Sequence, residues 1–292
     1  MTPPTRVTLL VNPAAGRGRA ASAAAAVTSR LLSHGVRVEV APPGWPAAGD
    51  PLGAGAAVVA VGGDGTVHRA LQAVAGTPVA LGVVPTGSGN DLARFLGLPR
   101  ADPVAAADVV AAGHVRALDA VRASGQWYVS VLAAGFDAAV NARVDRMRLS
   151  RLLGALRYDA AVLAELPGLR ARRYRLELDG RVVHRVATLV AVANLPAYGG
   201  GLRIAPGAAA DDGLLDVVVA GPLSRAAALR LLVAVRRGTH LSHPAVDVVR
   251  ARTVTVTAPG VVGYADGEPI GPLPLTCEVV PAAVRVLVPA AP

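Results

Sequence analysis

Lysine is absent from this chain of 292 residues, and all 29 of its basic residues are arginine. A Schiff-base mechanism needs a lysine, and so does the Walker phosphate-binding loop, which ends in Gly-Lys-Ser/Thr. Both are therefore excluded, and phosphate binding must depend on main-chain amides, arginine and a metal ion. The net charge of +9 favours anionic partners, a class that includes nucleotide phosphates, acidic lipid surfaces and nucleic acid.

Cysteine, aromatic residues and long apolar runs are also scarce. The single Cys277 has no partner for a disulfide within the chain. We find neither a signal-peptide pattern nor an uninterrupted apolar run of about 18 residues, so we expect a cytoplasmic protein. Aromatic residues make up only 3% of the chain. Few side chains are therefore available to stack on nucleic-acid bases, and nucleic acid is not an expected partner.

The length predicts two domains, because one hydrophobic core rarely serves so many residues. Near the N-terminus, apolar runs alternate with helical patterns, which is typical of an α/β domain with a parallel sheet. From about residue 117 onward, strand follows strand, which predicts a mainly antiparallel, β-sandwich-like second domain. We place the domains at 1–119 and 120–292, with the ATP site expected in the cleft between them.

The expected elements follow from hydrophobic periodicity and from turn residues. In the first domain we expect strands at 7–11, 36–40, 56–61 and 79–84, with helices at 20–32 and 66–74. In the second domain we expect a helical insertion at 138–166, a buried amphipathic helix around 226–235, and strands at 126–131, 174–178, 181–193, 214–219, 253–257 and 284–288.

A glycine-rich loop follows the third expected strand and reads Gly62-Gly63-Asp64-Gly65-Thr66. Such a loop lies where a parallel sheet binds ligands, at the carboxyl end of a strand, and its small residues let the backbone approach phosphates. The helix that follows directs free amides at an anion, and Asp64 can contact a metal ion or a donor hydroxyl. The alternative is a tight turn in which Asp64 only caps a helix.

Two further loops resemble this first one. The segment 85–91, which includes Ser88, Asn90 and Asp91, leaves the next strand and opens another helix. The segment 12–20 has a Gly-x-Gly-x-Ala spacing, with Glu39 about 20 residues further on, which partly mimics a dinucleotide fingerprint. The GxGxxG spacing is missing, however, so a redox role is weakly supported, while Arg17 and Arg19 are candidate phosphate contacts.

Two acidic segments lie in the second domain. Asp211 to Asp216 reads as an Asp-Gly hairpin turn that leads into a strand. Asp266-Gly267-Glu268 supplies a candidate general base, since a carboxylate can accept the proton that an attacking alcohol loses. A plain surface turn is the rival explanation for the same three residues.

These motifs together resemble those of the bacterial diacylglycerol kinases and related lipid kinases, which share a catalytic domain with sphingosine and ceramide kinases. The resemblance extends over nearly the whole chain. It also includes Ala134 to Asp137, Ala193-Asn194 with Gly199 to Gly201, and Ile204-Ala205-Pro206. Several separated motifs in the right order are far more specific than any one of them.

The resemblance implies an ATP- and magnesium-dependent kinase that transfers the γ-phosphate to a lipid hydroxyl, with a diacylglycerol-like acceptor. It implies Glu268 as proton acceptor, with Asp64 as the second choice. It implies a magnesium site formed by Asp212, the Leu214 carbonyl and a group near Ala209. The implied ATP-binding residues are Asn12, Pro13, Gly16, Arg17, Gly62, Gly63, Asp64, Gly65, Thr66, Ser88, Asn90 and Asp91.

Other interpretations stay open on the sequence alone. An NAD kinase shares the Gly-Gly-Asp-Gly-Thr loop but phosphorylates a soluble nucleotide, and a non-catalytic nucleotide- or nucleic-acid-binding regulator is a further alternative. The stretch from Arg143 to Arg175 carries nine arginines against three acids. It predicts peripheral contact with an anionic membrane, or else a solvated basic face. A homodimer is compatible with the sequence, and His240 and His243 are interpreted as solvated helix-end residues.

Overall fold

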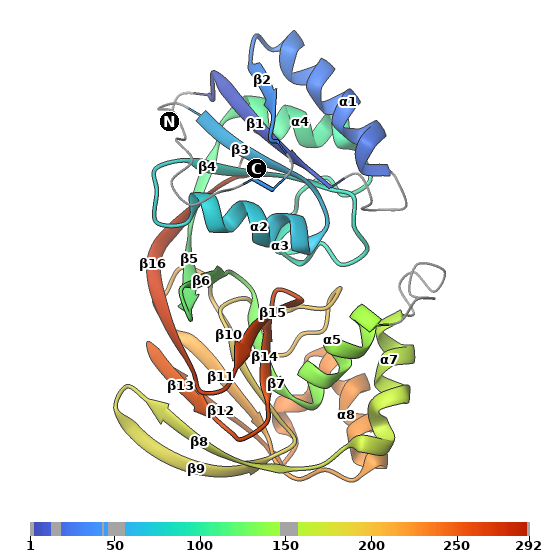
Figure 1. The fold of residues 1–292 in the computed structure, drawn as a ribbon, viewed down its shortest axis with the longest axis vertical. Helices are drawn as coiled ribbons and strands as arrows, with labels where there is room; N and C mark the ends of the chain where they lie inside the picture. The colour runs from blue at the N-terminus through green and yellow to red at the C-terminus, as the bar shows by residue number, and fades with distance from the viewer. Residues whose placement is uncertain (1–2, 13–18, 43, 46–55, 147–156, 291–292) are drawn as a thin grey trace. The chain divides into compact units, whose positions relative to one another are not determined.

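The computed structural model describes residues 3–12, 19–42, 44–45, 56–146 and 157–290. The chain divides into two compact units (Figure 1). The first comprises Met1–Ala120 together with Pro281–Pro292, and the second comprises Val121–Val280.

The first unit is an α/β domain around a parallel sheet. Its strands run in the order β2-β1-β3-β4, and every one of these pairs is parallel. The end of β16 (Leu275–Leu287) continues the sheet, since Arg285 pairs in parallel with Ala80. The other elements are β1 (Arg6–Val11), α1 (Arg19–Ser33), β2 (Arg37–Val40), β3 (Ala56–Gly62), α2 (Asp64–Val74), β4 (Ala80–Pro85), α3 (Asp91–Phe95), α4 (Pro103–Ala112) and the start of β5 (Val115–Ala123).

Helices cover both faces of this sheet, as expected for a parallel sheet whose strands are apolar throughout. Strands β3 and β4 are buried along almost their whole length. Helices α1 and α4 pack together on one face, while α2 contacts β3 and β4 from the other (Figure 1). The covered sheet leaves only strand ends and loops free to form a site.

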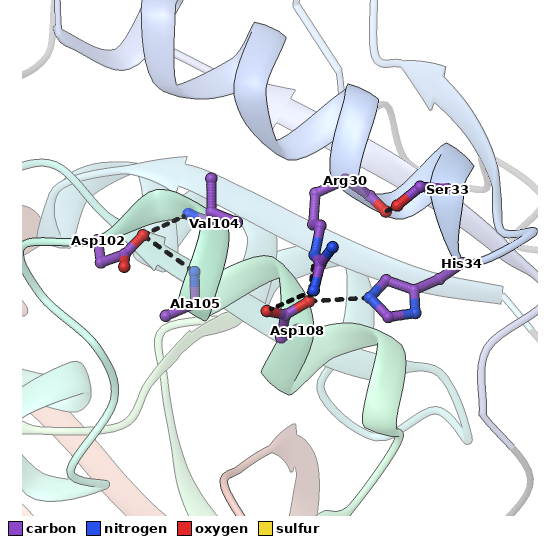
Figure 2. A network of polar contacts seen from close by, with 7 residues as sticks. All are labelled: Arg30, Ser33, His34, Asp102, Val104, Ala105 and Asp108. Carbon is purple, nitrogen blue, oxygen red and sulfur yellow. Dashed lines mark hydrogen bonds and ion pairs between the residues drawn. The ribbon is translucent and has the colours of Figure 1, made fainter.

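A polar network ties α1 to α4 on the surface of the first unit (Figure 2). The Arg30 guanidinium donates to both carboxylate oxygens of Asp108, at 2.6 and 3.1 Å, and His34 lies 2.8 Å from the same carboxylate. Helix α4 begins at a capping residue, Asp102, which accepts hydrogen bonds from the amides of Val104 and Ala105.

The second unit contains two antiparallel sheets that enclose a common hydrophobic core. One sheet has the strand order β12-β11-β10-β7-β14-β15, and the other includes β13, β8 and β9. Their bounds are β6 (Gln126–Tyr128), β7 (Val131–Gly135), β8 (Arg172–Leu178), β9 (Arg181–Ala187), β10 (Leu189–Ala193), β11 (Leu215–Ala220), β12 (Val246–Ala251), β13 (Thr253–Thr257), β14 (Val262–Ala265) and β15 (Glu268–Pro272).

Three α-helices lie on the outer face of the first of these sheets. They are α5 (Phe136–Arg146), α7 (Arg157–Glu165) and α8 (Arg225–Arg237), with short 3-10 helices at Leu166–Gly168 and His240–Ser242. Helix α8 begins at Ser224, whose hydroxyl accepts from the Ala227 amide, and ends at Gly238 in the left-handed conformation. None of the helices within the described ranges has the length and hydropathy needed to cross a bilayer.

The fold class expected from the sequence is confirmed, with parallel strands in the first unit and antiparallel strands in the second. Four expected elements differ. The segment 126–131 contains β6 and the start of β7, which belong to different sheets. The strand expected at 284–288 is the end of β16, which begins at Leu275. The segment 181–193 is two strands, because the chain leaves one sheet after Ala187 and joins the other at Leu189. The expected helical insertion contains two helices, α5 and α7, and its residues 147–156 lie outside the described part of the chain.

The Arg30–Asp108 network should make the stability of the fold depend on pH. Hydrogen bonds from Arg30 and His34 lower the pKa of Asp108 in the folded protein. A carboxyl with a lowered folded pKa stabilises the fold above its unfolded pKa and loses that contribution as the pH falls through the folded value. We expect Asp108→Asn to lower the thermal midpoint by about 1–3 °C at neutral pH. The difference from wild type should shrink below about pH 4. A difference that is constant across this range would contradict the assignment.

Candidate active site

Three loops leave the same edge of the first unit's sheet. Asn12 follows β1, Gly63 follows β3 and Thr86 follows β4, and these strands are neighbours in parallel register. The Asn12 amide donates to the Val61 carbonyl at 3.3 Å, and the Thr86 amide donates to the Gly62 carbonyl at 2.8 Å. The predicted loops therefore meet at the carboxyl ends of adjacent strands, where parallel sheets bind ligands.

The two glycine-rich loops approach each other backbone to backbone. A Cβ atom added to Gly87 would lie 2.6 Å from the Cα atom of Gly63, and one added to Gly62 would lie 2.1 Å from the Thr66 hydroxyl oxygen. Both distances are too short for any side chain. Glycine is required here by close approach, which explains why these motifs contain so many small residues.

Asp64 joins these loops. Its Oδ2 atom accepts a hydrogen bond from the Asn90 amide at 2.8 Å, and its Oδ1 atom accepts one from the Asp91 amide at 2.7 Å. These amides open helix α3, and Asn90 adopts a left-handed conformation with φ of 55°. Asp64 is therefore a helix cap that acts between loops, and both of its oxygens already serve main-chain donors.

Buried polar side chains gather beside this junction. Thr66, Thr86 and Asn90 are all less than a tenth exposed. The Asn90 side-chain amide donates to the Gly87 carbonyl at 2.8 Å. Within the described ranges, however, the Thr66 and Thr86 hydroxyls and the Asn90 Oδ1 atom have no hydrogen-bond partner. Buried polar atoms normally find a partner, so these three are suited to a polar ligand or to water.

The other predicted nucleotide contacts are placed less deeply. Ser88 is exposed, and Arg19 begins α1 and donates to the Thr86 carbonyl at 3.3 Å. Gly65 lies within the first turn of α2. Three of the expected contacts, Pro13, Gly16 and Arg17, lie outside the described residues.

In the second unit, the Asp266-Gly267-Glu268 motif forms the tight turn between β14 and β15. Asp266 and Gly267 both have positive φ, which two-residue hairpin turns require. The Asp266 carboxylate accepts the main-chain amides of Val129 and Ser130, at 3.1 and 2.9 Å, and a short hydrogen bond from the Ser130 hydroxyl. Glu268 is exposed at the first position of β15. Asp266 thus anchors the turn, and Glu268 is the acid that reaches solvent.

A buried asparagine completes this anchor. Asn194 is fully buried, its side-chain amide donates to the Val129 carbonyl at 2.8 Å, and its main-chain amide donates to the Ser130 carbonyl at 2.8 Å. We gave neither Ser130 nor Asn194 a role from the sequence. The sequence did contain the Ala193-Asn194 motif, but no local pattern indicated that Asn194 and Asp266 bind the same segment, Val129-Ser130.

Of the residues predicted to hold magnesium, Asp212 lies beside an arginine. Asp212 accepts the Leu214 amide at 3.0 Å through one oxygen and lies 3.5 Å from an Arg250 nitrogen through the other. Asp216 lies 3.4 Å from the same guanidinium. Burial raises the pKa of Asp216, and Arg250 opposes that rise. No group of three or more His, Cys, Asp or Glu side chains suited to a metal occurs in the described ranges. The one carboxylate of the predicted set, Asp212, therefore already faces the positive charge of Arg250.

An apolar cavity lies in the second unit, between the sheet face and helices α5, α7 and α8. Nearly all of the wall is hydrocarbon, with residues such as Val140, Val162, Leu189, Val218, Ala228 and Leu231.

An acid and a histidine belong to this mostly apolar wall. Burial raises the pKa of Asp137, which accepts hydrogen bonds from the Tyr158 and Tyr198 hydroxyls. His240, interpreted from the sequence as solvated, is instead only 1% exposed. Its Nε2 atom lies 2.8 Å from the Ile204 carbonyl, which can only accept, and burial lowers its pKa. Both groups therefore favour their uncharged forms, as an apolar cavity requires.

Comparison with known proteins places these features in a family. Residues 6–123 match the diacylglycerol kinase catalytic domain, and residues 130–288 match the YegS C-terminal NAD kinase beta sandwich-like domain. The chain is 43% identical over 296 residues to a diacylglycerol kinase of Mycobacterium tuberculosis (strain CDC 1551 / Oshkosh), covering 97% of this chain and 95% of that one. It is 30% identical over 201 residues to a diacylglycerol kinase of Bacillus subtilis (strain 168), covering 68% and 66%.

Solved structures share the fold. A crystal structure of a diacylglycerol kinase from Bacillus anthracis strain Sterne superposes with a TM-score of 0.70 at 20% identity, over 98% of this chain and 97% of that one. A second crystal structure from the same organism gives a TM-score of 0.78 at 22% identity, over 99% and 97%. At these identities the likeness establishes the architecture alone.

The role of Asp64 as a bridge between loops leads to a prediction. Asp64→Ala should lower the free energy of unfolding by about 1–2 kcal/mol, the usual loss for a helix cap. It should also speed hydrogen exchange at the Asn90 and Asp91 amides, which lose their acceptor. Asp102→Ala, which removes the cap of α4, is the matched control: it should cost similar stability and leave exchange at residues 90 and 91 unchanged. Unaltered exchange in Asp64→Ala would show that the carboxylate does not hold the second loop.

Proposed function

We propose the reaction of this chain from one premise: it belongs to the diacylglycerol kinase family, whose members transfer a phosphate group to a hydroxyl acceptor. The proposed reaction is transfer of the γ-phosphate of ATP to the hydroxyl of a diacylglycerol-like lipid. Magnesium bound with ATP would neutralise charge on the phosphate oxygens. The bond from the acceptor oxygen to the γ-phosphorus forms as the bond to the β-γ bridging oxygen breaks, and ADP leaves.

The first unit is proposed to bind the phosphates of ATP. Its main-chain amides at the start of α2 and the buried Thr66, Thr86 and Asn90 oxygens are polar groups suited to a nucleotide. The junction through Asp64 keeps these groups in place before the ligand arrives. Such preorganisation is the main contribution that a protein makes to phosphoryl transfer, since the chemistry needs mostly positioning and charge stabilisation.

Glu268 is proposed to accept the proton of the lipid hydroxyl. Glu268 is exposed, whereas the carboxylates of Asp266 and Asp64 both accept hydrogen bonds from main-chain amides. This division of roles favours Glu268 over Asp64 as the general base. Asp64 and Asp266 then act as positioning residues for the loops on which the reacting groups lie.

The apolar cavity is the observation that favours a lipid over a soluble nucleotide as acceptor. A hydrocarbon chain would bury its surface against a wall of Val, Leu and Ala side chains, and each buried methylene contributes about 0.8 kcal/mol. The polar NAD molecule would find few hydrogen-bond partners there. NAD kinase activity is kept as the second candidate because the second domain matches a family model described as NAD kinase-like.

Peripheral contact with an anionic membrane is part of the proposal, because a diacylglycerol-like acceptor resides in a bilayer. Two arginines of the basic stretch have partners within the chain. Arg143 is paired with Glu165, and Arg146 donates to the Ala142 carbonyl at 3.0 Å, while Leu163 on α7 is 59% exposed. Arg148 and Arg151, also expected to contact the membrane, lie outside the described residues.

Replacement of the proposed base tests the chemistry. Glu268→Gln should lower kcat for lipid phosphorylation by about 10²–10⁴-fold, the usual contribution of general base catalysis, with little change in the KM for ATP. Glu278→Gln, at another exposed strand glutamate of the same unit, is the matched control and should behave as wild type. Full kcat in a folded Glu268→Gln protein would exclude this residue as the base.

Filling the cavity tests the acceptor. Ala228 lines the cavity from α8, and Ala226 on the same helix is exposed. Ala228→Phe should raise the KM for a long-chain diacylglycerol about tenfold or more, because at least two methylenes lose their burial. A very short-chain diacylglycerol should be affected much less, and Ala226→Phe should change neither value. Equal effects of the two substitutions would argue that the chain binds elsewhere.

A further inference from the structure

The antiparallel register of β11 and β12 places an arginine directly opposite a buried acid. Asp216 and Arg250 are paired residues in this ladder, and paired side chains lie about 5 Å apart at Cβ. The Asp216 side chain is 7% exposed and the Arg250 side chain 46%. The cation therefore enters from the solvent side and covers an acid that lies beneath it.

Each nitrogen of the Arg250 side chain faces a different oxygen. Nε lies 3.4 Å from an Asp216 carboxylate oxygen, and Nη1 lies 3.5 Å from an Asp212 carboxylate oxygen. Nη2 donates to the Gly207 carbonyl at 3.1 Å. One guanidinium thus connects three points of the segment between residues 207 and 216, which leads into β11.

Two carboxylates and a main-chain carbonyl are also the donors that a magnesium ion prefers. A divalent cation at the same oxygens would lie beside the permanent positive charge of Arg250, and like charges at this distance repel. Asp212 has in addition committed its other oxygen to the Leu214 amide at 3.0 Å. A divalent cation and the Arg250 guanidinium are therefore alternative partners for these oxygens, and this chain already supplies the guanidinium.

We propose that Arg250 is a built-in cation that takes the place of a metal ion in the second unit, so that the turn from Gly207 to Asp216 is held without any divalent cation. The magnesium site implied by the family resemblance at Asp212, Leu214 and Ala209 is then absent from this chain. The magnesium requirement of the reaction comes from ATP alone. This inference does not depend on which hydroxyl is phosphorylated.

Removal of the guanidinium would leave the buried Asp216 carboxylate without its counter-charge. Asp216 Oδ2 has no hydrogen-bond partner among the described residues, so without Arg250 its carboxylate would have no cationic neighbour within the described ranges. The emptied oxygen set would then be open to a divalent cation. Lysine at this position would keep the charge but lose the three-way fork, because an ammonium is a single point of positive charge.

Thermal unfolding of the full-length chain without nucleotide tests this proposal. The variants are Arg250→Met, Arg250→Lys and the matched control Arg252→Met, each measured in EDTA and in excess MgCl₂ at constant ionic strength. We expect wild type and Arg252→Met to show the same midpoint with and without magnesium. Arg250→Met should unfold roughly 2–8 °C lower in EDTA, with Arg250→Lys between the two.

Magnesium should recover part of the loss in Arg250→Met, and the double variant Arg250→Met with Asp212→Asn should show no recovery. Binding of Mn²⁺, followed by water-proton relaxation, gives a second readout that does not depend on unfolding: Arg250→Met should bind an ion that wild type does not. The proposal is overturned if magnesium stabilises wild type through Asp212, or if Arg250→Met is as stable in EDTA as Arg252→Met.

Discussion

The carboxylate of Asp64 accepts hydrogen bonds from the main-chain amides of Asn90 and Asp91, and these two bonds connect the loops at the carboxyl-end edge of the first unit's sheet. They join the loop after β3 to the loop after β4, where Gly63 and Gly87 leave no room for side chains. Three buried polar atoms, on Thr66, Thr86 and Asn90, lie around this junction without partners in the described ranges. The junction thus creates the surface on which ATP binding is proposed.

The same interaction, an aspartate that accepts hydrogen bonds from main-chain amides, recurs along the chain, although the chain has only 20 acidic residues. Asp266 accepts the amides of Val129 and Ser130, Asp179 accepts those of Arg252 and Thr253, and Asp119 accepts that of Ala282. Carboxylates that accept main-chain amides fix loops at defined positions. Aspartates in conspicuous motifs are therefore mostly anchors here, and Glu268 is distinguished by being an exposed acid next to such an anchor.

Sequence patterns predicted the elements whose signals are local. Strands β3 and β4 were expected within a residue of their observed bounds, because apolar runs end there at glycine or proline. Local patterns did not predict features that depend on residues far away in the sequence. The sheet change near Thr188 carries no turn residue, and the burial of His240 depends on Ile204. The Arg250 pairing follows from strand register, which the sequence of β12 alone does not reveal.

The central claim is that this chain phosphorylates a lipid hydroxyl with ATP. The most direct measurement supplies ATP labelled at the γ-phosphate to the purified protein, with diacylglycerol in mixed micelles and NAD present in the same reaction, and separates lipid from water-soluble products. We predict label in a phosphorylated diacylglycerol and none in NADP. Label in NADP with none in the lipid fraction would contradict it.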